Sequence, residues 1–97
     1  MTVPQVGPSG VQTPPLMIVR VFLFAALRER AGAREVAVEA PAGITVGVLR
    51  GLIAAAHPVL APLLPNAALA INESYATDEF VIQPGDAVAL IPPVSGG

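Results

Sequence analysis

The sequence predicts one small α+β domain in which a mixed sheet wraps a single main helix. Short segments with alternating apolar and polar residues occur near the start, the middle and the end of the patterned region, as in half-buried strands. One longer segment, residues 45–56, has the apolar spacing of a helix instead. The expected order is strand, short helix, strand, long helix, strand, short strand, strand, which is typical of this fold class. A length of 97 residues allows little beyond one such domain.

The first expected strand covers residues 18–24, where β-branched and aromatic residues dominate. Two phenylalanines beside an arginine on one side indicate an outer face that is apolar without being core. The pattern fits a central strand buried on both faces equally well. The expected inward residues are Val19, Val21 and Leu23, and the expected outward residues are Arg20, Phe22 and Phe24.

A short helix and a second strand follow. Residues 26–31 are good helix formers, with Leu27 facing inward, and Gly32 is a natural C-terminal stop. Residues 34–39 alternate again, with Val36 and Val38 directed inward, and Pro41 ends this strand.

The main helix is expected to begin after Thr45 as N-cap and to run through Ala56. Its apolar stripe lets it lie across the sheet. The chain has a single histidine, His57, which we interpret as a capping or solvated residue without a chemical role. The stripe consists of Val46, Leu49, Ile53 and Ala56, widened by Val48 and Leu52.

The rest of the domain is expected to contain an apolar turn at residues 59–64, a strand at 67–71, a short strand near 75–76 and a last strand at 87–91. Pro84 and Gly85 suit the central positions of a type II turn before the last strand. In that strand we expect inward Val88 and Leu90, and outward Ala89 and Ile91.

Both ends of the chain differ from the domain of residues 17–91. Residues 1–16 contain four prolines, two glycines and no charge, and we expect a disordered leader. Residues 92–97 begin with two prolines, which favour an extended path, and end with Gly96 and Gly97, which can thread a narrow channel. The α-carboxylate of Gly97 is the candidate reactive group, and an unordered terminus without function is the alternative.

Composition excludes several classes of function. The net charge is −2 and the five cations are scattered arginines, which argues against nucleic-acid binding. No run is long enough for a membrane span, and no signal peptide is evident, so we expect a cytoplasmic protein. Without cysteine the chain has no thiolate ligand or sulfur nucleophile. We expect no metal site and no permanently bound cofactor.

Four segments resemble the family of molybdopterin synthase small subunits, the sulfur carriers of molybdenum cofactor biosynthesis. They are VRVFLFAALRE (residues 19–29), AIN (70–72), Gly85 with Asp86, and ALIPPVSGG (89–97). The resemblance covers residues 17–97, and its closing PPVSGG is the most specific part. Leu90 and Ile91 depart from a common form that has aromatics there. The family implies a ubiquitin-like β-grasp fold.

The resemblance further implies a reaction cycle at Gly97. An E1-like enzyme consumes ATP to adenylate the carboxylate, a sulfur donor converts it to a thiocarboxylate, and the large synthase subunit uses that sulfur on cyclic pyranopterin monophosphate. The chain would thus be the sulfur-donating subunit and no enzyme on its own. The tail residues Pro92, Pro93, Val94, Ser95 and Gly96 would thread into the partner, and Phe24, Tyr75 and Ile91 would form the partner-binding patch.

Other functions fit the same residues. A carrier for thiamine biosynthesis, or a carrier that modifies proteins, would share the fold and the terminal chemistry. A ubiquitin-like binding module with an inert tail belongs to another class.

Overall fold

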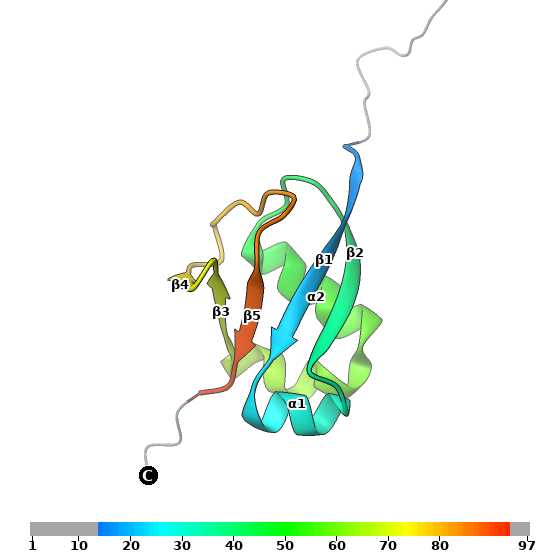
Figure 1. Cartoon of the computed structure of the whole chain (residues 1–97), viewed down its shortest axis with the longest axis vertical. Coiled ribbons are helices and arrows are strands. Elements are labelled where there is room, and N and C mark those ends of the chain that lie inside the picture. Colours follow the sequence, from blue (N-terminus) through cyan, green and yellow to red (C-terminus); the bar gives the residue numbers. More distant parts are fainter. Residues whose placement is uncertain (1–13, 94–97) are drawn as a thin grey trace, which may run out of the picture.

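A five-stranded mixed sheet with the strand order β2-β1-β5-β3-β4 forms the body of the protein (Figure 1). The structure is a computed structural model that describes residues 14–93. Strand β1 pairs antiparallel with β2 and parallel with β5, and β3 lies between β5 and β4, antiparallel to both. The elements are β1 (Leu16–Leu23), α1 (Ala25–Ala31), β2 (Glu35–Pro41), α2 (Val46–Ala56), the 3-10 helix η1 (Pro58–Asn66), β3 (Ala68–Ile71), β4 (Ser74–Ala76) and β5 (Val88–Ile91).

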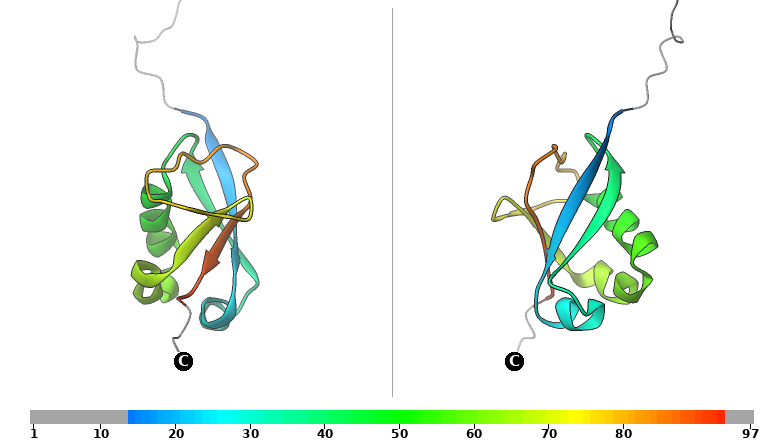
Figure 2. Two further views of the ribbon diagram at one scale, coloured as in Figure 1. Left: turned by 90° about the vertical axis from the view of Figure 1, so that its left-hand side faces the viewer. Right: turned by 45° about the vertical axis from the view of Figure 1, so that its right-hand side comes forward.

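Helices α2 and η1 lie against one face of the sheet, α1 lies at the end of the sheet where β1 finishes, and no helix within residues 14–93 covers the other face (Figure 2). Exposed and buried residues alternate along the whole of β1, so every second side chain enters the core. On the open side Ile18 is 61% exposed and Phe22 is 39% exposed. Burial of this strand on both faces is therefore wrong, and the outward apolar face predicted from its alternation is confirmed.

The ends of β1 differ from those expected. Leu16 pairs with Pro41 of β2, and the Ala42 N–H donates to the Pro15 carbonyl at 2.8 Å. Leu16 thus belongs to the sheet and Pro15 is hydrogen-bonded next to it, which corrects the expectation that both residues are part of a disordered leader. At the other end, Phe24 has left the strand and precedes α1 in an extended conformation.

The main helix begins as predicted, because the Thr45 Oγ1 accepts a hydrogen bond from the Val48 N–H at 3.2 Å. Val46, Leu49 and Ile53 are buried, but the expectation for Val48 is wrong, since 51% of it is exposed. At 3.6 residues per turn Val48 lies about 200° around the helix from Val46, away from the sheet. Ala56, in the last turn, is also exposed.

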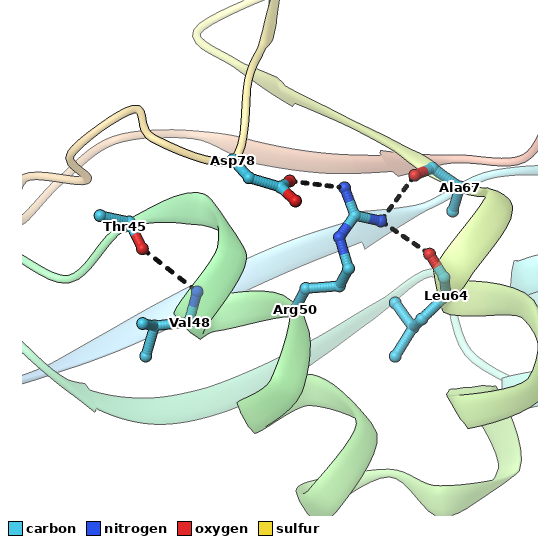
Figure 3. A network of polar contacts seen from close by, with 6 residues as sticks. All are labelled: Thr45, Val48, Arg50, Leu64, Ala67 and Asp78. Atoms are coloured by element: carbon cyan, nitrogen blue, oxygen red, sulfur yellow. Dashed lines mark hydrogen bonds and ion pairs between the residues drawn. The ribbon is translucent and has the colours of Figure 1, made fainter.

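The apolar turn expected at residues 59–64 is instead the nine-residue helix η1. Arg50 of α2 fixes its end, because its guanidinium donates to the carbonyls of Leu64 (2.6 Å) and Ala67 (2.7 Å). The same guanidinium pairs with Asp78 Oδ1 at 3.1 Å (Figure 3). One side chain thus connects α2 with the end of η1 and with the segment that follows β4.

Two glycines behave as expected. Gly32 ends α1 with φ 72°, and Gly85 has φ 90°, as the third residue of a type II turn requires. None of the helices within residues 14–93 is long and apolar enough to span a membrane.

Candidate functional site: an apolar surface where the C-terminal tail begins

The parallel pairing of β1 and β5 brings Phe24 and Ile91 together at the end of the sheet where both strands finish. Leu23 pairs with Leu90, so the two strands end side by side. Phe24 follows the last residue of β1, and Ile91 is the last residue of β5. Pro92 and Pro93 continue from this end of the sheet. Residues 94–97, with the candidate reactive Gly97, lie outside the described part of the chain.

A shallow depression of about 370 Å³ lies where β1 and β5 end. Its lining is hydrocarbon, since neither the proline rings nor the other side chains carry a polar atom. Ala25, the first residue of α1, has φ 51°, a left-handed conformation that costs an L-residue roughly 1–2 kcal/mol. The chain turns sharply there, and the Phe24 side chain is left 48% exposed. The lining residues are Phe24, Ala25, Ile91, Pro92 and Pro93.

A second depression of about 280 Å³ adjoins the first, with Phe24 in both. Alanines contribute short side chains to it and the phenylalanines contribute long ones, which makes the open face uneven. Together the two depressions form what we call the tail-root surface. The second depression is lined by Phe22, Phe24, Glu73, Ala87, Val88 and Ala89.

Tyr75 lies on the same open face but apart from the tail-root surface. It pairs with Ala70, which pairs with Ala89, which in turn pairs with Phe22. The side chains of this row share one face, and Tyr75 is 74% exposed. Two strand spacings place it about 10 Å from β5. The structure therefore brings Phe24 and Ile91 together and leaves Tyr75 as a separate exposed aromatic on the same side.

Charged groups lie at the border of this face. Arg20 Nε donates to Glu35 Oε2 at 2.8 Å, between β1 and β2. That hydrogen bond, and the charge attraction of the same carboxylate, raise the pKa of Arg20. The arginine stays charged, and its charge is balanced within the chain. Glu73 borders the second depression from the β3–β4 turn.

Sequence reasoning did not include Phe22, Ala25 and Glu73 in the site. The alternation of β1 already placed Phe22 on the outer face, two residues from Phe24, and this signal identifies it. No local signal marks Ala25 or Glu73, because their places depend on a backbone turn and on the neighbouring strand.

Two other polar features within residues 14–93 belong to the fold. His57 Nε2 lies 3.2 Å from the carbonyl oxygen of Ala37 on β2, in keeping with a structural role. At the start of α2 the N–H groups of Val46 and Gly47 donate to the carbonyls of Phe80 and Asp78, both at 2.9 Å. This helix end therefore has no free donors for a phosphate. Within the same residues no group of three or more His, Cys, Asp or Glu could hold a metal ion.

Comparison with known proteins identifies the class to which this fold and surface belong. A family model described as the ThiS family matches residues 21–97, and the chain therefore belongs to the ThiS family. Along most of its length it is similar to molybdopterin synthase sulfur carrier subunits. The Chlamydomonas reinhardtii subunit is 39% identical over 84% of this chain and 100% of the relative. The Arabidopsis thaliana subunit is 35% identical over 81% and 82%. The predicted family resemblance is thus confirmed.

Solved structures agree. SAMP1 from Haloferax volcanii superposes with a TM-score of 0.72 at 33% identity, covering 82% of this chain and 99% of that one. A Helicobacter pylori structure, a complex of subunits 1 and 2 of molybdopterin-converting factor, gives a TM-score of 0.60 at 26% identity, covering 84% of this chain and 100% of that one. Caldiarchaeum subterraneum ubiquitin has a TM-score of 0.60 at 19% identity, covering 86% of this chain and 100% of that one, and shows the fold alone. The predicted ubiquitin-like β-grasp fold is confirmed.

Proposed function

We propose that this chain is a sulfur carrier whose Gly97 carboxylate is adenylated, converted to a thiocarboxylate and used to donate sulfur. A carboxylate is a poor electrophile, and an adenylate supplies the leaving group that sulfur then displaces. The observation that carries the proposal is the family match, which continues through Gly97. The tail-root surface supports it, because it is an open apolar surface beside Pro92 and Pro93, where the tail begins.

The catalytic side chains belong to the partners in this account. The tail residues 92–97 enter an active site of the partner, and Phe24, Tyr75 and Ile91 dock on its surface. An E1-like enzyme supplies the adenylate from ATP, in the cytoplasm, and a separate donor supplies sulfur. The large subunit of molybdopterin synthase then transfers the sulfur to cyclic pyranopterin monophosphate. The relatives named above and the two-subunit Helicobacter pylori complex favour this partner.

Intact-mass spectrometry tests the proposal directly. The full chain is incubated with its activating enzyme, ATP and a sulfur source. We expect a mass gain of about 16 Da, the exchange of one oxygen for sulfur at the terminus. Omission of ATP is the control and leaves the mass unchanged. An unchanged mass in the complete reaction would contradict the carrier function and favour an inert tail.

Modification of proteins is a second candidate function, favoured by the similarity to SAMP1, a small archaeal modifier protein. In that case the activated carboxylate forms an isopeptide bond to a lysine of another protein. The chain has no lysine, so a side chain of its own cannot accept it. Conjugates that appear after activation in a cell extract, and fail to appear with a large synthase subunit alone, would support this function. A sulfur carrier for molybdopterin synthase is distinguished from one for thiamine biosynthesis by the partner that copurifies with the chain, which is the large synthase subunit in the first case and a thiamine-pathway protein in the second.

A further inference from the structure

Four residues form a hydrogen-bond network where the β3–β4 turn meets the start of β5. We call it the Asn72 network, and it consists of Asn72, Gln83, Asp86 and Ala87. Asn72 Nδ2 donates to Asp86 Oδ1 at 3.1 Å, and the Gln83 N–H donates to Asp86 Oδ2 at 2.8 Å. The side chains that form it are largely exposed and contribute little to the core. Their use must be found in what they hold in place.

Asn72 adds one residue pair to the β3–β5 ladder beyond the end of β3. Its N–H donates to the Ala87 carbonyl at 2.8 Å, as in any antiparallel pair. The return bond cannot use the Asn72 carbonyl, because the backbone turns away there with φ 51°. The side-chain Oδ1 accepts the Ala87 N–H instead, at 3.0 Å. Asparagine suits this position because it tolerates the left-handed conformation and carries the acceptor.

The network matters for the tail because β5 is short. The strand has four residues, and its pairs with β1 number three. Burial of Val88 and Leu90 opposes a slip by one residue, which would turn β5 over. Alternation alone does not distinguish a slip by two residues, which would move the tail by about 7 Å. Hydrogen bonds that recognise Asp86 and Ala87 individually oppose both slips.

The same residue also holds the docking elements together. Asn72 begins the two-residue turn between β3 and β4, and Tyr75 follows on β4. Ile91 and the tail follow on β5. We propose that Asn72 and Asp86 are positioning residues for sulfur transfer, which couple the β3–β4 hairpin to β5 and so fix where the C-terminal carboxylate is presented. This inference rests on the proposed carrier function.

The test uses the full chain and three variants. Asn72→Asp keeps the turn preference and the acceptor for Ala87 but faces the Asp86 carboxylate without a donor. The combined Asn72→Asp/Asp86→Asn exchange reverses donor and acceptor and restores every bond of the network. Thr45→Ala, which removes the cap of α2, is the control for a general loss of stability.

Two readouts separate the outcomes. Amide hydrogen exchange at residues 88–91, compared with residues 16–23, reports the hold on β5 without any sulfur chemistry. The rate of thiocarboxylate formation at saturating activating enzyme, beside the Kd for that enzyme, reports positioning. For Asn72→Asp we expect amide exchange in β5 to become about tenfold faster and the rate of thiocarboxylate formation to fall about tenfold. The Kd for the activating enzyme should change by less than about threefold. The combined exchange should recover both, and Thr45→Ala should change neither selectively.

Wild-type levels of both readouts in Asn72→Asp, or no recovery in the combined variant, would overturn the positioning role. Faster β5 exchange with an unchanged rate would overturn it as well. If the wild-type chain gains no sulfur, the proposed function fails instead. The exchange pattern then still decides whether the network holds β5.

Discussion

Replacement of Phe24 by alanine tests whether the tail-root surface is a docking site. A phenylalanine side chain has about 200 Å² of accessible surface. Because 48% of Phe24 is exposed, about 100 Å² remains for a partner to cover. At about 25 cal/mol per Å² this corresponds to about 2.5 kcal/mol, of which alanine retains a small part. We therefore expect a loss of about 2 kcal/mol in binding, or about 30-fold in Kd.

Phe80→Ala is the matched control. Phe80 is 44% exposed, close to the value for Phe24, but it lies beside the start of α2 and outside both depressions. Both substitutions remove the same atoms from half-exposed positions, so we expect similar losses in folding stability. Only Phe24→Ala should weaken binding to the large synthase subunit.

Calorimetry with the large subunit measures Kd, and urea denaturation of the free domain measures stability. Equal binding by the two variants, with Phe24→Ala destabilising the domain by several kcal/mol, would mean that Phe24 is a core residue. Equal weakening by both would mean that the loss arises from the fold and not from the surface.

Two further predictions concern stability. In thermal denaturation, a chain that begins at Pro14 should melt like the full chain. A chain that begins at Met17 should lose about 1 kcal/mol of folding stability, since it lacks the Leu16–Pro41 pair and the hydrogen bond to the Pro15 carbonyl. A loss of stability already in the chain that begins at Pro14 would show that the removed residues pack on the domain. Arg50→Met should cost about 1–3 kcal/mol in urea denaturation, because the Ala67 carbonyl loses the Arg50 donor while the Leu64 carbonyl keeps only the Ala67 N–H. Arg50→Lys should recover only part of this loss, since it lacks the planar fork. Unchanged stability of Arg50→Met would refute this role.

The faces of the strands could be predicted from the sequence because alternation directly records which side chains enter the core. This holds for β1 and for the inward Val88 and Leu90 of β5. The ends of the strands could not be predicted in this way. β1 extends to Leu16 because Pro41 is there to pair with it, and that contact joins residues far apart in the chain.

The candidate site divides in the same manner. Phe24 and Ile91 could be predicted because each falls on the outward side of the alternation in its expected strand, and the parallel pairing of β1 with β5 explains why they meet. The greater separation of Tyr75 follows from the position of β4 at the edge of the sheet. The double use of Asn72 depends on the approach of Ala87, so no local pattern announces it.

The central claim is that the Gly97 carboxylate is the reactive group, and its position along the chain can be changed by one residue. Removal of Gly97 draws the carboxylate back by about 3.5 Å, more than positioned reactions tolerate. Addition of one residue displaces it as far outward. The decisive measurement is the thiocarboxylate yield by intact-mass spectrometry, at concentrations where binding to the activating enzyme is saturated. We predict a gain of about 16 Da for the wild-type chain and almost none for either variant. A wild-type yield from either variant would contradict the carrier account.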